Sequence, residues 1–143
     1  MGTKSIRHIV ETAVSTYLTA QAEFAGIQIS TGDSADVQSL PRIICYCPSA
    51  SPPPDLPEGL GNFLAQVEVH VMSSADDTNL TTHRARCAAV AGYMDSVTDL
   101  GAVFTSQGDA NLYDLTPQAE ADDHESRIWH TTLSYGVLCV LPA

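Results

Sequence analysis

Histidines on two strongly alternating segments are the residues with the clearest chemical potential in this sequence. His70 and His130 fall on the less apolar faces of the segments 63–72 and 127–141. If these segments pair as strands, the two imidazoles could be neighbours, and a metal site there would need a third ligand, for which Glu68 is a candidate. The spacing does not define that geometry, so the favoured interpretation is that these are ordinary surface or interface histidines.

Charged residues gather at two further places. The run Asp122-Asp123-His124-Glu125 resembles a ligand cluster in composition, but a calcium loop needs spaced acids and a turn glycine. A solvated acidic segment is therefore the favoured interpretation. Arg84 and Arg86 lie in the first turns of a predicted helix and could pair with carboxylates across an interface, since the planar guanidinium binds carboxylates well. A solvated helix face explains the two arginines equally well.

Signatures of catalysis are absent from the sequence. It contains no G-x-S-x-G, P-loop, H-E-x-x-H or Rossmann glycine pattern. The cysteines lack both a C-x-x-C pair and the spacing of a zinc finger. They fall at apolar positions of predicted elements, so we expect buried, reduced thiols at Cys45, Cys47, Cys87 and Cys139.

Composition limits the class of protein. A length of 143 residues predicts one domain, spanning 1–143, and 44% hydrophobic residues indicate a globular one. A net charge of −11, with no Lys or Arg between Asp95 and Glu125, argues against binding of nucleic acid through its phosphates. No apolar run approaches the length of a membrane span, and the N-terminal segment lacks the pattern of a secretory signal. A cytoplasmic origin is the resulting expectation.

The N-terminal half predicts a helix, a strand and a long loop. Apolar residues recur at helical spacing over 4–22, with Thr3 or Ser5 as the cap. After a short extended fragment at 27–29, the segment 42–47 is rich in strand formers. The stretch 48–61 is rich in proline, with four prolines after Ser49 at Pro52, Pro53, Pro54 and Pro57, and we expect a semi-rigid loop there, outside any central strand.

The C-terminal half alternates strands and helix. Strict alternation over 63–72 predicts a strand with Phe63, Ala65, Val67, Val69 and Val71 on its core face. A helix is predicted over 81–97, capped by Asp76 or Asp77. Short strands are predicted at 100–106 and 112–116, an acidic segment at 107–126 that includes a connection at 118–126, and a long strand at 127–141. Together these elements predict an α/β (α+β) fold, a mainly antiparallel mixed sheet with two helices packed on one face.

This order of elements resembles the tail terminator and tail completion proteins of long-tailed bacteriophages, which belong to the neck of the virion. The Pro-led strand 40–43, the long strand 63–72 with its acidic turn and helix, and the aromatic-led final strand from Trp129 carry the resemblance. The resemblance implies a structural protein that forms a ring, usually of six subunits, at the head-proximal end of the tail tube. Such a ring stops tube polymerisation and joins the tail to the head connector.

The resemblance also implies what the chain would contact. The partners would be copies of itself in a homohexamer, the tail tube protein, and the connector or stopper protein. DNA would pass through the lumen without specific binding. The location would be the virion, reached through the host cytoplasm. No catalytic residue, cofactor, metal or membrane is implied. Our own candidates for contact residues are the loop and charged residues Pro52, Pro53, Pro54, Asp55, Arg84, Arg86, Asp122, Asp123 and Glu125.

Three other functions fit the same sequence. A head-completion or stopper protein of the virion neck belongs to the same structural class. A metal-dependent enzyme would use His70, His130 and nearby acids. A small-ligand binding module would need a concave apolar pocket, which only the tertiary structure can display.

Overall fold

A computed structural model describes residues 5–32, 40–51, 62–125 and 127–141. Five strands form one open sheet in the order β1-β2-β3-β5-β4, in which β1 and β2 are parallel and every other pair is antiparallel. The strands are β1 (Gln28–Thr31), β2 (Arg42–Ser51), β3 (Asn62–Ser74), β4 (Asn111–Glu125) and β5 (Ile128–Val140). The predicted α/β class with a mainly antiparallel mixed sheet is confirmed.

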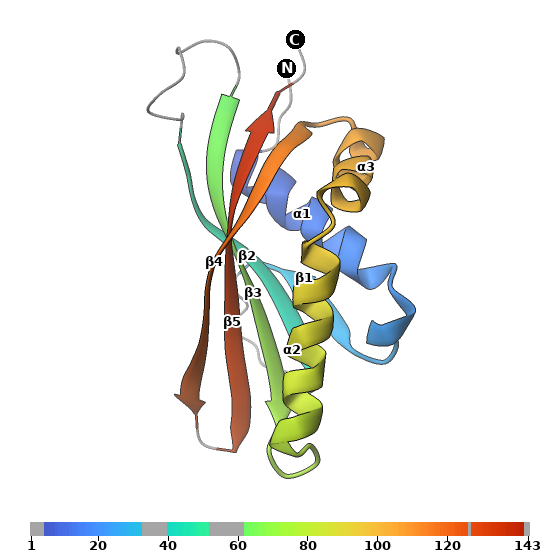
Figure 1. The fold of residues 1–143 in the computed structure, drawn as a ribbon, viewed down its shortest axis with the longest axis vertical. Coiled ribbons are helices and arrows are strands. Elements are labelled where there is room, and N and C mark those ends of the chain that lie inside the picture. Colours follow the sequence, from blue (N-terminus) through green and yellow to red (C-terminus); the bar gives the residue numbers. More distant parts are fainter. Residues whose placement is uncertain (1–4, 33–39, 52–61, 126, 142–143) are drawn as a thin grey trace.

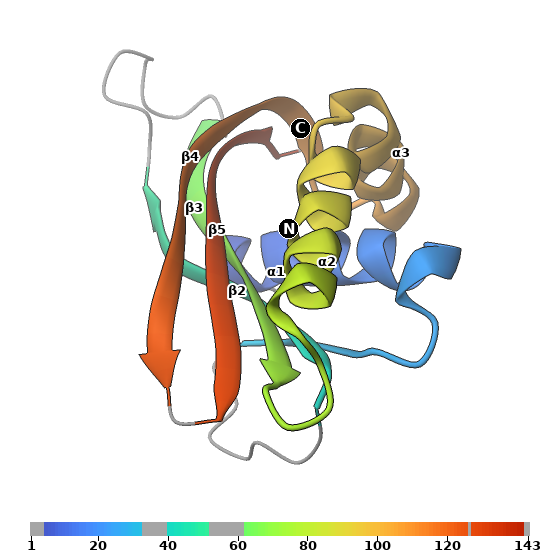
Figure 2. The ribbon, with the colours of Figure 1, turned by 60° about the horizontal axis from the view of Figure 1, so that its bottom comes forward.

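Helices cover one face of this sheet. They are α1 (Ile6–Thr19), α2 (Leu80–Met94) and α3 (Val97–Gln107), with a short 3-10 turn at Ala22–Phe24. Figures 1 and 2 show all of them on the same side, with the other face of the sheet left open. None of the helices among the described residues is long and apolar enough to cross a membrane.

Alternation of side chains along β3 separates the two faces, as predicted. Ala65, Val67, Val69 and Val71 are buried against the helices, whereas Gln66, Glu68 and His70 on the open face are only partly buried. The partner strand β5 runs between β3 and β4, so the two long strands form the centre of the sheet. Burial of this apolar face under the helices supplies the main driving force of the fold.

The predicted strand at 100–106 is wrong, because this segment belongs to α3. The Ser96 hydroxyl caps the helix by accepting from the Asp99 amide (3.3 Å), and Gly108 ends it in the left-handed conformation (φ 76°). Leu100 and Phe104, one helical turn apart, are both buried. Two large apolar residues spaced four positions apart lie on the same face of a helix. The structure therefore has a third helix beside the two that the sequence predicts.

The acidic connection predicted at 118–126 is also wrong, since one continuous strand, β4, runs from Asn111 to Glu125. The register shifts between Leu112 and Asp114 and again between Pro117 and Ala119. β4 lies at the edge of the sheet, where the missing N–H of a proline is tolerated because one side of the strand has no neighbour to bond. Bulges and charges on an edge strand also discourage pairing with other chains. Pro117 therefore interrupts the hydrogen bonding without ending the strand.

Several element boundaries also differ from the prediction. β2 continues through Pro48 to Ser51, four residues beyond the predicted end, with a register shift between Tyr46 and Ser49. α2 begins one residue after Asn79, whose side-chain oxygen accepts from the Thr82 amide (2.8 Å), so Asn79 is the cap in place of Asp76 or Asp77. α1 is shorter than 4–22, and Ser5 is its cap.

Candidate functional site

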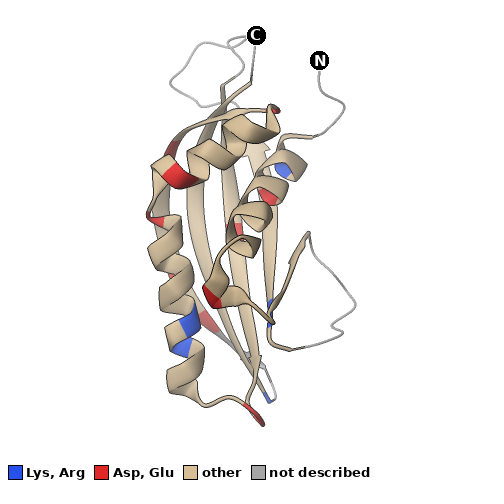
Figure 3. Ribbon diagram, turned by 90° about the vertical axis from the view of Figure 1, so that its right-hand side faces the viewer, with Lys and Arg blue, Asp and Glu red and all other residues tan. Residues whose placement is uncertain are grey.

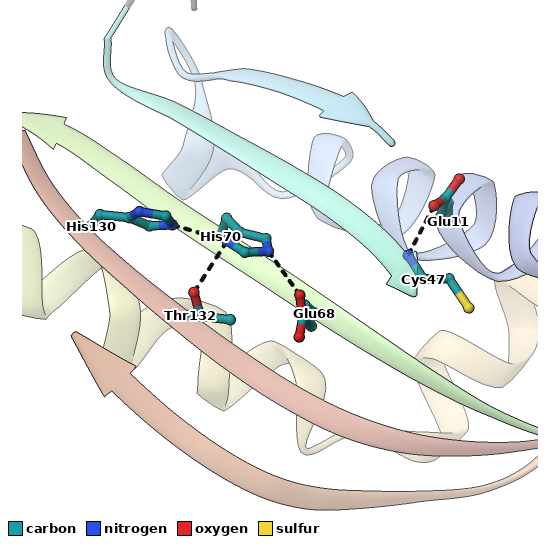
Figure 4. Close-up of polar contacts among 6 residues, drawn as sticks. All are labelled: Glu11, Cys47, Glu68, His70, His130 and Thr132. Carbon is teal, nitrogen blue, oxygen red and sulfur yellow. Dashed lines mark hydrogen bonds and ion pairs between the residues drawn. The ribbon is translucent and has the colours of Figure 1, made fainter. Parts of the chain in front are cut away.

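The two predicted histidines are neighbours on the open face of the sheet. His70 Nδ1 lies 2.9 Å from His130 Nε2, and the two ring centroids are 5.2 Å apart (Figure 4). The pairing arises because β3 and β5 are adjacent and antiparallel, with His70 opposite Thr132 and Met72 opposite His130. The two histidines are therefore diagonal neighbours across the strand pair.

Glu68, the candidate third ligand, contacts His70. Its carboxylate lies 3.1 Å from His70 Nε2, on the far side of the ring from His130, as Figure 4 shows. The three side chains thus form a line and do not converge on one point. Among the described residues, no group of three or more His, Cys, Asp or Glu side chains has the arrangement of a metal site.

A chain of hydrogen bonds, buried at its centre, links α2 to β3, β5 and β4 around His83. Arg86 donates to the Ser73 hydroxyl (2.8 Å), and Ser73 lies 2.9 Å from His83 Nδ1. On the other side of the ring, His83 Nε2 lies 2.9 Å from the Thr131 hydroxyl. Thr131 in turn donates to Asp122 (2.7 Å). Every donor in this chain finds an acceptor if His83 is neutral and carries its proton on Nε2.

Burial of His83 favours that neutral state. Its side chain is 1% exposed, and this desolvation lowers its pKa from the usual 6.5. Asp122 acts in the opposite direction, while Arg86, His130 and Arg84 lower the pKa further. The network therefore holds a neutral imidazole between a cation and an anion.

A groove runs beside this network, between α2 and the strands β4 and β5. One cavity of about 210 Å³ is lined by Leu80, His83, Arg84, Asp122, Trp129 and neighbouring residues. A second cavity of about 330 Å³ shares Arg84, Asp122 and Thr131 with it. The sequence could not display this concavity, because it depends on how far α2 lies from the edge strand.

Two predicted interaction residues, Arg84 and Asp122, are brought together across this groove. Their guanidinium and carboxylate groups are 3.7 Å apart, with side chains that are 66% and 56% exposed. Basic residues are sparse over the described elements, and those of α2 lie together near its first turns (Figure 3). Arg86 points instead to Ser73 and takes part in the buried network.

Of the remaining predicted interaction residues, two are located by the strand register and the others lie outside the described residues. Asp123 lies opposite His130 and Glu125 opposite Ile128, both at the end of the β4–β5 hairpin. Pro52, Pro53, Pro54 and Asp55 lie outside the described residues. The predicted role of these residues in binding stays a prediction.

All four cysteines are buried free thiols, as predicted. Desolvation is the main cause that raises their pKa values, to about 12 for Cys45 and Cys139 and to about 11 for Cys47. The pKa of Cys87 is also raised, again chiefly by burial. Such thiols are inert core residues at neutral pH.

One polar contact was not anticipated from the sequence. Cys47 lies where the register of β2 shifts, and α1 satisfies its backbone: Glu11 accepts from its amide (2.8 Å, Figure 4) and Arg7 donates to its carbonyl (2.7 Å). A signal for it is present, because Glu11 falls on the same helix face as the buried Val14 and Leu18. An acid on an apolar face indicates a specific partner.

Comparison with known proteins gives a match in structure alone. No protein-family model matches the sequence. No curated protein matches it either. Among solved structures, the fold is similar to that of a chain in a structure described as "Virion of native gene transfer agent (GTA) particle", with a TM-score of 0.61 and 15% sequence identity. The match covers 92% of this chain and 94% of that chain, so nearly the whole fold is shared.

Proposed function

We propose that this chain is a structural protein of a virion, and that it forms a ring at the head-proximal end of a tail tube. The observation that carries the proposal is the fold shared, over nearly the full length of both chains, with a chain of a gene transfer agent virion. The order of strands and helices independently resembles that of phage tail terminators. In this role the ring stops polymerisation of the tube and presents the surface that receives the head connector.

The mechanism needs only binding. A closed ring forms when head-to-tail contacts between identical subunits have a rotation that closes, and six subunits is the expected number. The strongly acidic character of the chain, with a net charge of −11, suits a lumen through which DNA slides, because like charges repel. The chain would act in the virion neck after assembly in the host cytoplasm, without a catalytic residue or cofactor.

The groove beside α2 and the end of the β4–β5 hairpin are the surfaces that we propose for contacts with neighbouring subunits. The exposed pair Arg84 and Asp122 lies on this surface, and its charges are available to a partner because the pair is held by one long contact of 3.7 Å. Exposed ion pairs contribute little to the stability of a monomer, so they can exchange partners at low cost.

Capping of tail tubes tests the proposal directly. The purified protein is added to the tail tube protein of the same virus while tubes assemble, and the products are examined by negative-stain electron microscopy. We expect tubes that stop growing and carry a ring at one end. A protein that neither forms rings nor binds tube ends, with assembled tubes present, would contradict the proposal. Binding to the connector alone would favour a head-completion or stopper protein instead.

Charge reversal then tests the proposed surface. We expect R84E to leave the monomer folded but to prevent ring formation, because the substituted side chain repels the acidic groove wall and any acidic neighbour. D76K, a charge reversal in the exposed turn before α2, serves as the control and should assemble normally. If R84E assembles as well as D76K does, the groove is not the contact surface.

A further inference from the structure

The open face of the sheet carries a line of polar side chains across its two central strands. Glu68 and His70 come from β3, and His130 and Thr132 come from β5 (Figure 4). His70 and Glu68 are 21% and 26% exposed, so solvent reaches them while the strands hold their backbones. Glu68, His70 and Thr132 do not line the groove beside α2, whereas His130 lies at its border and is one of its lining residues.

The contacts of His70 define which of its nitrogens can accept. A carboxylate can only accept a hydrogen bond, so the Glu68 contact at 3.1 Å places the proton of the neutral ring on Nε2. The lone pair of Nδ1 then points toward His130 Nε2 at 2.9 Å, with the Thr132 hydroxyl 3.1 Å away. A carboxylate behind one nitrogen and a lone pair at the other is the arrangement that orients a metal-binding histidine.

The distance between the two facing nitrogens suits a shared ion. Zinc binds imidazole nitrogen at about 2.0–2.1 Å, so two such ligands in a tetrahedral site are about 3.4 Å apart. The present separation of 2.9 Å needs an opening of roughly half an ångström, within reach of small ring rotations because both side chains are partly exposed. Binding also requires the neutral ring of His130 to carry its proton on Nδ1, so that the lone pair of Nε2 faces the ion.

We propose that His70 and His130 bind one divalent transition-metal ion, Zn²⁺ or Ni²⁺, with Glu68 positioning His70 from behind. Imidazole nitrogen suits these ions and not Mg²⁺ or Ca²⁺, which prefer oxygen. Two protein ligands leave the other coordination positions to solvent, so the site exchanges its ion readily. This proposal departs from the expectation from sequence that these are ordinary surface or interface histidines, and it gives Glu68, the candidate third ligand, a positioning role.

Calorimetric titration of the purified protein with Zn²⁺ and Ni²⁺ tests the site. We expect one ion per chain, with binding at least about tenfold weaker in H70Q and in H130Q, since each loses one of two nitrogen ligands. E68Q should weaken binding by about 10- to 100-fold, because the orienting carboxylate is lost. H8Q is the control: His8 lies on an exposed part of α1, away from the site, and its loss should change nothing.

The acidity of the chain calls for a second control, because a net charge of −11 attracts any cation. Excess Mg²⁺ should fail to displace Zn²⁺ from the site. NMR of the imidazole nitrogens should show changes on His70 Nδ1 and His130 Nε2 when Zn²⁺ is added, a readout that does not depend on the folding of any variant. Unchanged nitrogen signals, equal binding in H70Q and H8Q, or displacement by Mg²⁺ would each overturn the proposal.

Discussion

The carboxylate of Glu11 on α1 accepts a hydrogen bond from the backbone amide of Cys47 on β2, 36 residues away, at 2.8 Å. The register of β2 against β3 shifts at this point, so Cys47 is not among the paired residues of that ladder. The side chains of α1 therefore replace part of the sheet hydrogen bonding. This contact fixes α1 against β2 where the strand enters its final residues.

Truncation of Glu11 should destabilise the protein. E11A leaves the buried Cys47 amide without its acceptor, and we expect a loss of about 1–3 kcal/mol in the free energy of unfolding. E11Q keeps an acceptor oxygen and should lose less. Urea unfolding followed by the fluorescence of Trp129, the single tryptophan, measures both. Equal losses in E11A and E11Q would show that the charge of Glu11, and not its hydrogen bond, matters.

Stability should depend on pH through His83. Burial lowers the pKa of His83 in the folded state below the 6.5 of the unfolded chain, so the unfolded state binds the proton more readily. The contribution of His83 to the free energy of unfolding is therefore complete above pH 6.5, and it is lost as the pH falls below that value. H83Q should flatten this part of the curve of unfolding free energy against pH. H8Q, at an exposed position of α1, is the control for the loss of one imidazole.

The cysteines should resist modification in the folded protein. Their pKa values are raised, to about 12 for Cys45 and Cys139, so the reactive thiolate is scarce at neutral pH, and burial blocks access. We expect slow reaction with a thiol reagent at pH 7.5 and reaction of all four thiols in denaturant. A thiol that reacts at the rate of a free model thiol in the native protein would contradict the buried placement.

Arg84 and Asp122 should differ in their effects on stability although they form one ion pair. The pair is exposed, so we expect R84A to cost less than about 1 kcal/mol. Asp122 also accepts from the buried Thr131 hydroxyl, and D122A should cost about 1–3 kcal/mol by leaving that donor without its partner.

A double-mutant cycle separates the two contacts of Asp122. The coupling energy should be near zero between Arg84 and Asp122 and clearly larger between Asp122 and Thr131. A larger coupling energy for Arg84 with Asp122 than for Asp122 with Thr131 would mean that the exposed ion pair, and not the hydrogen bond to Thr131, holds β4 against α2.

Local patterns in the sequence determined the elements whose burial repeats regularly. Alternation along 63–72 and 127–141 predicted β3 and β5, because one face of each strand must be buried and a slip by one residue would expose it. Helical spacing predicted α1 and α2 for the same reason. The pairing of β3 with β5 also places His70 beside His130, an arrangement that the sequence left open.

Tertiary structure decided what depends on neighbours distant in the chain. β4 is a strand although it contains Pro117 and a run of acids, because an edge position tolerates both. The segment 97–107 is a helix in which Leu100 and Phe104 pack into the core beside α1, although the helical spacing of these two residues was already present in the sequence. The contacts of Glu11, His83 and Glu68 likewise follow from packing between elements, since the sequence specifies a polar side chain but not its partner.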